Sequence, residues 1–404
     1  MNDATTPVLP AADSSGAILA LIRSGVATTR ARIMQVTGLS RSTVGQRLDT
    51  LIAAGYLEQG GSAASTGGRP QASLRINPAF GVMLLADIGA EKMRLALADM
   101  HGNTLASSSA QNDIAAGPVV TLDLVLQQFD GLLAAADRTR SEVKGIGIGV
   151  PGPVEFAQGR VVRPPIMTGW DGVVVPDFFA PYFNCPVRVD KDVNLMALGE
   201  HRVVWPDVAH MMYVTIGTGI GAGLIMDGRP QRGAQGGAGD LGHLFMGHAG
   251  SAGGGQLPLC RCGNAGCLEA YAAGWSLTRQ LESRGYPVHL AQDVAALARQ
   301  GDAEVVALLL QSGRLLGEAL AQAVSLLNPS LVVLGGALAD SQDHLLAGVR
   351  EMVYRRSLPL ATRNLQILGS QLADEAALTG CVHLVADAVF APHAVDAALA
   401  GNAG

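Results

Sequence analysis

The sequence predicts a small winged helix-turn-helix domain at the N-terminus, followed by an α/β body of two lobes. Short amphipathic helical patterns fill residues 16–54, and a β-hairpin pattern follows over residues 56–76. Apolar strands bounded by glycine turns begin after residue 80, and a similar strand-turn-strand pattern returns at residue 212. The 404 residues suffice for two or three domains, and the apolar share of 49% allows a large aliphatic core.

The N-terminal pattern contains three helices. The first is expected over residues 16–25 and the second over residues 29–36, and the Gly38-Leu39-Ser40 turn separates the second from the third. Ser40 is the expected N-cap of the third helix, which runs from residue 41 to about residue 54. Short polar and cationic side chains gather at the start of this helix, where a recognition helix meets base edges. These side chains are Arg41, Ser42, Thr43, Gln46 and Arg47.

Residues 56–59 and 72–76 are expected to pair as the wing of this head. Between them lies Arg69, where it can meet phosphate or enter the minor groove. Residues 1–80 hold seven arginines against four acidic residues, an excess of three positive charges, whereas the whole chain carries −6. A basic head on an acidic body favours double-stranded DNA as the partner of the head. A dimerisation or peptide-binding domain of three helices is the alternative.

The body begins with a three-strand meander, and part of this meander recurs later in the chain. Strands are expected over residues 82–87, 94–99, 104–110, 143–150, 212–216, 221–226 and 331–334. Helices are expected over residues 121–137, 270–283, 291–299, 303–327, 341–356 and 375–390. Such a duplicated meander resembles the actin-like ATPase fold, in which two lobes clasp a nucleotide and a sugar.

This pattern divides the chain into five parts. They are a flexible arm over 1–14, the head over 15–79, lobe 1 over 80–200, lobe 2 over 201–375, and a C-terminal segment over 376–404. In the last segment a helix is expected to return to lobe 1 and to be followed by a tail.

A cluster of metal-binding residue types lies in lobe 2, over residues 239–269. Three of the five cysteines fall here, at Cys260, Cys262 and Cys267, with His243 upstream. Three thiolates and one imidazole complete a tetrahedral zinc site with no open position, so this Zn²⁺ would be structural. His248 is a competing ligand, and three unrelated buried cysteines are the plain alternative.

The run GDLGH followed by CRCGNAGCLE resembles the zinc loop of the ROK family, which comprises bacterial repressors and sugar kinases. The head, with GLSRSTV and the wing's GRP, also resembles that of ROK repressors, which the kinases usually lack. The resemblance implies that Asp240, His243 and Glu269 face a sugar. It also implies that Asp192 matches the general base of the kinases, beside Lys191. A simple helix N-cap is the other interpretation of Asp192.

The resemblance further implies loops that bind nucleotide phosphates. The matching residues are Asp87, Gly89, Gly217, Thr218, Gly219, Gly335 and Gly336. Tight hairpins alone are the alternative role for these glycines. Three positions depart from the kinase pattern: Glu91 replaces a hydroxyl residue near the phosphates, and Lys191 and Ile166 replace sugar-binding asparagines. Glu91 would repel phosphates, and Lys191 is expected to pair with Asp192 and lower its basicity. The three changes argue against ATP and Mg²⁺ as working cofactors.

We therefore expect a DNA-binding transcriptional regulator of carbohydrate-related genes, and a repressor in the first instance. A sugar-like effector would bind in the altered kinase cleft, and a homodimer or homotetramer would bind the operator. An ATP-dependent sugar kinase with an accessory DNA-binding head is the alternative, and DNA binding without any effector is a third hypothesis. A polar N-terminus and the lack of an apolar run of about 18 residues favour a cytoplasmic protein with no membrane partner.

Overall fold

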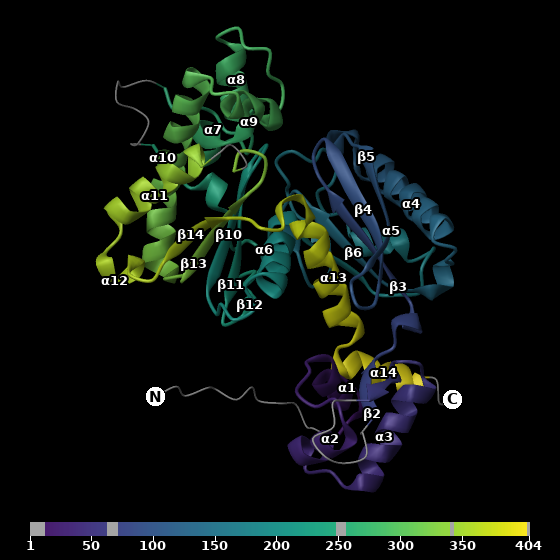
Figure 1. The fold of residues 1–404 in the computed structure, drawn as a ribbon. Helices are drawn as coiled ribbons and strands as arrows, with labels where there is room; N and C mark the ends of the chain where they lie inside the picture. Colours follow the sequence, from purple (N-terminus) through teal and green to yellow (C-terminus); the bar gives the residue numbers. More distant parts are fainter. Residues whose placement is uncertain (1–12, 63–71, 248–255, 340–342, 402–404) are drawn as a thin grey trace.

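The computed structural model describes residues 13–62, 72–247, 256–339 and 343–401. A small helical head lies beneath a body of two lobes, and each lobe is built on a five-stranded sheet (Figure 1). The winged helix-turn-helix and the two-lobed α/β body expected from the sequence are confirmed. Most of the expected arm, Arg69 of the wing and His248 lie outside the described residues.

The head consists of three helices and a hairpin. Its elements are α1 (Ser15–Arg23), α2 (Arg30–Thr37), α3 (Arg41–Ala53), β1 (Leu57–Ser62) and β2 (Ala72–Ile76). Gly38 ends α2 in the left-handed conformation, with φ 71°, which a residue without Cβ adopts at no steric cost. Ser40 then starts α3, because its side chain accepts a hydrogen bond from Thr43 N at 3.1 Å. This tight turn fixes the angle between α2 and α3.

Lobe 1 contains a sheet with strand order β5-β4-β3-β6-β9. The strands are β3 (Val82–Ile88), β4 (Lys92–Asp99), β5 (Thr104–Gln111), β6 (Val143–Val150) and β9 (Val187–Lys191), with the short pair β7 (Val154–Glu155) and β8 (Arg160–Val161). Its other elements include α4 (Pro118–Ala135) and α5 (Val175–Phe179). One face of the sheet packs against α4 through a core that includes Leu84, Leu95 and Phe129. The other face packs against a helix from the far end of the chain.

Lobe 2 repeats this arrangement with the order β12-β11-β10-β13-β14. The strands are β10 (Met211–Ile216), β11 (Ile220–Met226), β12 (Arg229–Pro230), β13 (Leu331–Gly335) and β14 (Gln366–Gly369). In both sheets the first three strands form an antiparallel meander and the last two add in parallel. The repeat predicted from the sequence is therefore a repeat of sheet topology. The helices are α7 (Leu268–Ala272), α8 (Gly274–Glu282), α9 (Ala291–Arg299), α10 (Ala303–Leu327), α11 (His344–Arg356) and α12 (Pro359–Thr362).

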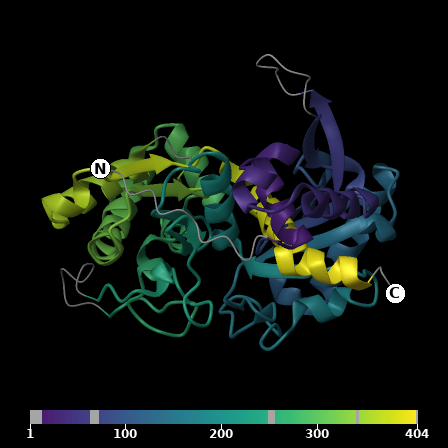
Figure 2. The same ribbon diagram turned by 90° about the horizontal axis from the view of Figure 1, so that it is seen from below.

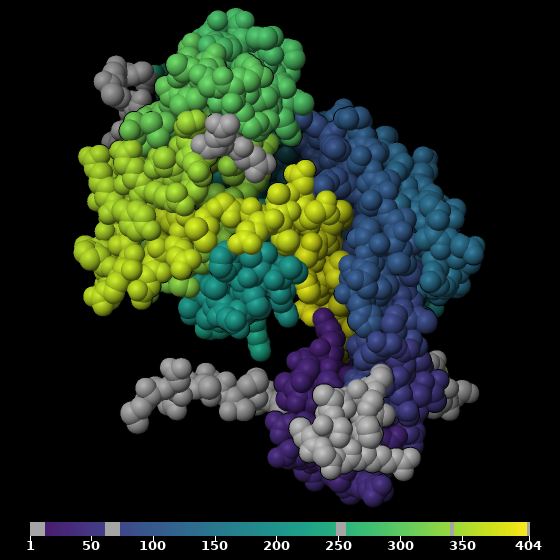
Figure 3. Space-filling model, in the orientation of Figure 1, coloured from purple at the N-terminus to yellow at the C-terminus, as the bar shows by residue number. Residues whose placement is uncertain are grey.

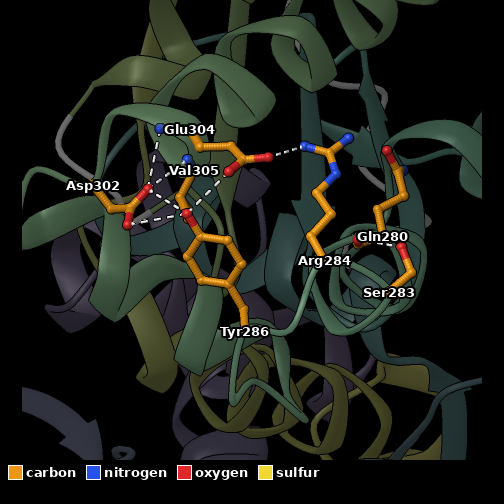
Figure 4. A network of polar contacts seen from close by, with 7 residues as sticks. All are labelled: Gln280, Ser283, Arg284, Tyr286, Asp302, Glu304 and Val305. Carbon is orange, nitrogen blue, oxygen red and sulfur yellow. Dashed lines mark hydrogen bonds and ion pairs between the residues drawn. The ribbon is translucent and has the colours of Figure 1, made fainter.

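A polar network fastens the end of α8 to the start of α10 in lobe 2 (Figure 4). The Tyr286 hydroxyl lies 3.1 Å from a Glu304 carboxylate oxygen and 3.2 Å from one of Asp302. Asp302 also caps α10, because it accepts hydrogen bonds from the backbone of Glu304 and Val305. The helices α8 and α10 of lobe 2 are thus joined by side chains as well as by the backbone between them.

Two expectations about helices are wrong. The helix expected over 270–283 is two helices, because Ala273 is extended with ψ 160°. This break frees the backbone N–H groups of Gly274 and Trp275, which donate to the carbonyls of Gly217 and Thr218. The segment after residue 390, expected to be a tail, contains the helix α14 (Pro392–Gly401). Tertiary contacts determine both the break at Ala273 and the helix α14, so the local apolar pattern did not predict them.

The helices α6 (Asp192–Val203) and α13 (Ala376–Val389) pack against each other between the two sheets (Figure 1). Glycines allow the close approach: a Cβ added to Gly380 would lie 1.9 Å from the carbonyl oxygen of Leu195. One face of α6 packs on lobe 2, where Val193 and Ala197 share a cluster with Tyr213. Its other face joins the core of α13 and the head. Figure 3 shows α13 in yellow between the lobes.

The first and the last helix of the chain, α1 and α14, lie side by side in the head. Viewed from below, α14 lies beside α1 (Figure 2). Gly16 N donates to Asp396 Oδ1 at 2.8 Å, and the ring of Phe390 lies edge-on to Tyr56 and tilted to Phe80, with centroids 6.5 and 6.0 Å away. The head and α13 therefore share one core. Among the described residues no single helix has the length and apolar character to cross a membrane; α13 with its preceding turn and α14 meet that test only as a pair bent by 53°.

A pair of glycine substitutions tests the α6–α13 packing. We expect Gly380→Ala to lower the free energy of unfolding by about 2 kcal/mol or more, since the new methyl group would overlap the α6 backbone. Gly131→Ala in α4 should instead be neutral or raise it by up to about 1 kcal/mol, because nothing lies within 4 Å of the added Cβ. Urea unfolding of both variants measures the difference, and equal effects would contradict the packing.

Candidate functional site

The start of α3 presents a polar surface to solvent. Arg41, Ser42, Gln46 and Arg47 are exposed, and Thr43 is half-buried. Arg47 Nε donates to the carbonyl of Asp13 at 3.2 Å, which tethers that side chain near the N-terminal end of the head. The opposite face of α3, with Val44, Leu48 and Leu51, is buried in the head. The structure therefore brings all five side chains predicted in α3 to one open helix end, with the apolar face turned inward.

Four side chains with soft donor atoms meet in the loop before α7. They are His243, Cys260, Cys262 and Cys267, whose donor atoms all lie within 4.8 Å of one another. His243 Nδ1 lies 3.6 Å from Cys260 Sγ, and Cys262 Sγ lies 3.7 Å from Cys267 Sγ. In a tetrahedral site with bonds of about 2.3 Å to sulfur and 2.0 Å to nitrogen, the nitrogen–sulfur separation is about 3.5 Å and the sulfur–sulfur separation about 3.8 Å. These two separations therefore match those of a site that could hold one metal ion.

Two thiols of this cluster, those of Cys260 and Cys267, resist ionisation without a cation, whereas hydrogen bonds lower the pKa of Cys262. Burial, together with the neighbouring Cys262 and Cys260, raises the pKa of Cys267 to about 12, and burial also raises the pKa of Cys260. A bound dication would supply the charge that lets several thiolates coexist. The donor set and its geometry both indicate that the cluster could hold a metal ion.

Two carboxylates meet at the edge of lobe 1 that faces lobe 2. Asp87 lies near the end of β3 and Asp192 at the start of α6, and both side chains are partly buried. Burial and then the charge of Asp192 raise the pKa of Asp87 to about 7. Between them, on β6, a Cβ added to Gly149 would lie 3.4 Å from the Asp87 carboxylate. The absence of a side chain there allows the two acids to approach each other.

Lys191 does not form the expected ion pair with Asp192. Its Nζ lies 3.7 Å from Asp240 Oδ1 in lobe 2, so the lysine joins the two lobes across the cleft. Burial raises the pKa of Asp192, and the nearby lysine charge offsets this only in part. The expected effect of Lys191 on the basicity of Asp192 is therefore present, but the net pKa of Asp192 still rises. The reason is that desolvation of a buried carboxylate outweighs the charge of one neighbouring lysine.

Asp190, two residues before Asp192, has a role that sequence reasoning missed. It is 2% exposed, and it accepts hydrogen bonds from Asn194 Nδ2 at 2.8 Å and Arg232 Nε at 2.7 Å. Arg232 also lies over the ring of Phe156, 3.8 Å from its centroid. The i, i+4 spacing of Asp190 and Asn194 was visible in the sequence, but the approach of Arg232 was not. This group holds the start of α6 to lobe 2.

Glu269 lies between the metal cluster and the glycine loop of β10–β11. It is 9% exposed, and it accepts hydrogen bonds from Ile220 N at 3.1 Å and Trp275 Nε1 at 3.2 Å. A Cβ on Gly219 would lie 2.9 Å from its Oε2. The carboxylate thus fixes the loop 217–219 against the metal loop. The Nδ1 of His243 faces Cys260, which leaves Nε2 available to a ligand.

The predicted phosphate loops lie at the cleft. Gly89 follows β3, residues 217–219 connect β10 to β11, and Gly335 and Gly336 end β13. Gly336 has φ +89°, and a side chain there would meet the carbonyl of Ile216 at 2.7 Å, so the two turns of lobe 2 are in contact. A cavity of about 480 Å³ is lined by Glu91 from lobe 1 and by Thr218, Arg261 and Trp275 from lobe 2. Glu91 therefore does border the cleft, as its position in the sequence suggested.

Family models match both parts of this architecture. Residues 84–388 match the model of the ROK family, and residues 12–61 match that of the IclR helix-turn-helix domain. The chain is 29% identical to the xylose repressor of Caldicellulosiruptor bescii over 382 residues, which covers 91% of this chain and 94% of the relative.

Solved structures resemble the chain in the same way. One is a ROK family transcriptional regulator, a homologue of the Escherichia coli MLC protein, with a TM-score of 0.77 and 25% identity, covering 94% of this chain and 97% of the other. A ROK glucokinase from Streptomyces griseus, in complex with glucose and AMPPNP, gives a TM-score of 0.62 and 27% identity, covering 75% of this chain and 99% of the kinase. The part that the kinase leaves unmatched is large enough to include the head. Because the ROK model spans most of its length, the chain belongs to the ROK family.

Proposed function

We propose that this protein is a sugar-responsive transcriptional repressor of carbohydrate genes. The observation that carries the proposal is the combination of an open recognition helix with a ROK body in one chain. Relatives that match about nine-tenths of the chain are named xylose repressors, whereas a matching glucokinase covers about three-quarters of it. The head would bind an operator as part of a homodimer or homotetramer. Action on DNA agrees with the cytoplasmic location expected from the sequence.

The proposed DNA contacts are the exposed side chains of α3, with Arg69 of the wing as a further candidate. We expect Arg41→Ala to weaken binding to a fragment of the protein's own promoter by about tenfold and to reduce the salt slope by about one. Fluorescence anisotropy across a range of salt concentrations measures both. Arg355→Ala, which removes an exposed arginine from α11 in lobe 2, is the matched control. Equal affinities for the two variants would count against α3 as the reading helix.

We propose that the cluster of His243, Cys260, Cys262 and Cys267 holds one structural Zn²⁺. The thiolate-rich, four-ligand set and its separations support zinc, and closed coordination leaves no position for catalysis. Its function would be to hold the loop of Asp240 and His243 against Glu269, which forms part of the proposed effector pocket.

Metal analysis tests this proposal. We expect one zinc per chain in the purified protein, and loss of zinc with a lower melting temperature in Cys260→Ser. Cys185→Ser is the control, because Cys185 lies in lobe 1 outside the cluster. A Cys260→Ser protein that retains stoichiometric zinc would show that the metal binds elsewhere.

We propose that the effector is a sugar bound between Asp192, Lys191, Asp240, His243 and Glu269. D-Xylose is the first probe, because the relatives are named xylose repressors, and D-glucose is the second. At one hundred times its Kd, a ligand of the native state raises the free energy of unfolding by about 2.7 kcal/mol. Thermal-shift titration should detect this in the natural protein and in the control Asp123→Ala, which removes an exposed carboxylate from α4, but less in Asp240→Ala. If no sugar raises the melting temperature, the hypothesis of DNA binding without an effector gains support.

A sugar kinase remains the second candidate because of one observation. Asp192 lies partly buried near Asp87, and desolvation raises its pKa, as suits a general base for a sugar hydroxyl. The repressor proposal predicts no ADP release above background with D-xylose or D-glucose. Turnover that disappears in Asp192→Asn would instead establish the kinase.

A further inference from the structure

The carboxylate of Asp387 bridges the DNA-binding head and the helix that begins at the effector cleft. Asp387 Oδ1 lies 2.7 Å from Arg23 Nη2 in α1, and Asp387 Oδ2 lies 3.2 Å from Arg202 Nη2 in α6. One acid in the last turn of α13 is thus shared by two arginines on different parts of the molecule. Arg23 also lies over the ring of Phe390, 5.5 Å from its centroid, which fixes its direction.

The two arginines belong to different parts of the molecule, Arg202 to the helix of the cleft and Arg23 to the head. Arg202 lies ten residues after Asp192 in the same helix, about 15 Å along α6, so it moves with the acids of the cleft. Arg23 moves with the head, because α1 is held to α14 by the bond from Gly16 N to Asp396. Asp387 lies just before the bend of 53° that separates α13 from α14. It therefore lies at the junction between the head and the body.

A change in the angle between the lobes would act on α6 from both of its ends. The first half of α6 is fastened to lobe 2 through Asp190 and Arg232. Its second half is fastened to the segment that leads into α13, because the buried Glu200 accepts hydrogen bonds from Ser370 Oγ and Gln371 N at 2.8 Å. Any shift between α6 and α13 would change the position of Arg202 relative to Asp387. Because each carboxylate oxygen of Asp387 contacts one arginine, Asp387 cannot keep both contacts if the two arginines move apart.

We propose that Asp387 transmits the state of the effector cleft to the head by holding Arg202 and Arg23 together in one lobe arrangement and releasing one of them in the other. The proposal rests on the repressor function proposed above. Asp387 would be a positioning residue: it contacts neither sugar nor DNA. Its side chain is 40% exposed, so the bridge adds little to overall stability, and its removal should leave the fold intact. What it contributes is the coupling between two sites.

The test measures coupling in the full-length protein. Affinity for a promoter fragment is determined with and without saturating D-xylose, and again with D-glucose. In the natural protein the sugar should change the operator Kd by about tenfold. In Asp387→Asn the change should fall below about threefold, while sugar binding and sugar-free operator binding stay within about twofold. Asp387→Glu should restore part of the coupling.

The matched control is Asp130→Asn, which removes another surface ion pair of lobe 1. Asp130 makes two hydrogen bonds with Arg140, at 2.9 and 2.7 Å, and its side chain is 45% exposed. This variant should keep the full coupling. If the sugar changes operator affinity equally in Asp387→Asn and Asp130→Asn, the proposed role of Asp387 is wrong. The proposed repressor function would still stand.

A measurement without a sugar separates the two proposals. Hydrogen–deuterium exchange of Asp387→Asn should rise together in α1 and in the last turn of α6, whereas Asp130→Asn should leave both unchanged. If the natural protein binds no promoter DNA, or no sugar alters its binding, the proposed function fails, but the exchange result still decides the bridge. Unchanged exchange in both helices would overturn it.

Discussion

The close packing of α6 against α13 is the contact on which the rest of the structure depends. Glycine at position 380 allows the two backbones to approach, so the helices form one unit between the sheets. Through α6 this unit reaches the acids of the cleft, and through α13 it reaches the core of the head. A molecule built in this way cannot change its lobe angle without disturbing the junction at its base.

The body resembles a ROK glucokinase in fold, and charged side chains from both lobes line its cleft. Asp87 and Asp192 lie close together and are partly buried, and the glycine turns of lobe 2 are in contact. Lys191 forms an ion pair with Asp240 across the lobes, and Glu91 borders the cavity beside Thr218. A cross-lobe ion pair suits a site that binds a ligand and changes shape, because each such contact depends on the lobe angle.

Much of the fold was predictable because it follows from local periodicity. The head, the two meanders and most helices were expected within a few residues, since apolar residues repeat at the helix or strand period. The metal cluster was also expected, because close cysteine spacing is itself a geometric constraint. The break at Ala273 and the helix after residue 392 were not, because Gly217 and α1, far away in the chain, determine them.

Residue types and their spacing were thus enough to assign the head, the repeated α/β body and the four side chains that could hold a metal ion. The partners of Lys191, Asp190 and Asp387 followed only from the packing of segments up to several hundred residues apart. The physical reason is that charge pairing acts over a few ångströms of space and leaves no period in the chain. Local secondary structure follows from the sequence pattern, whereas the ion pairs between the lobes and the head form only when the helices pack.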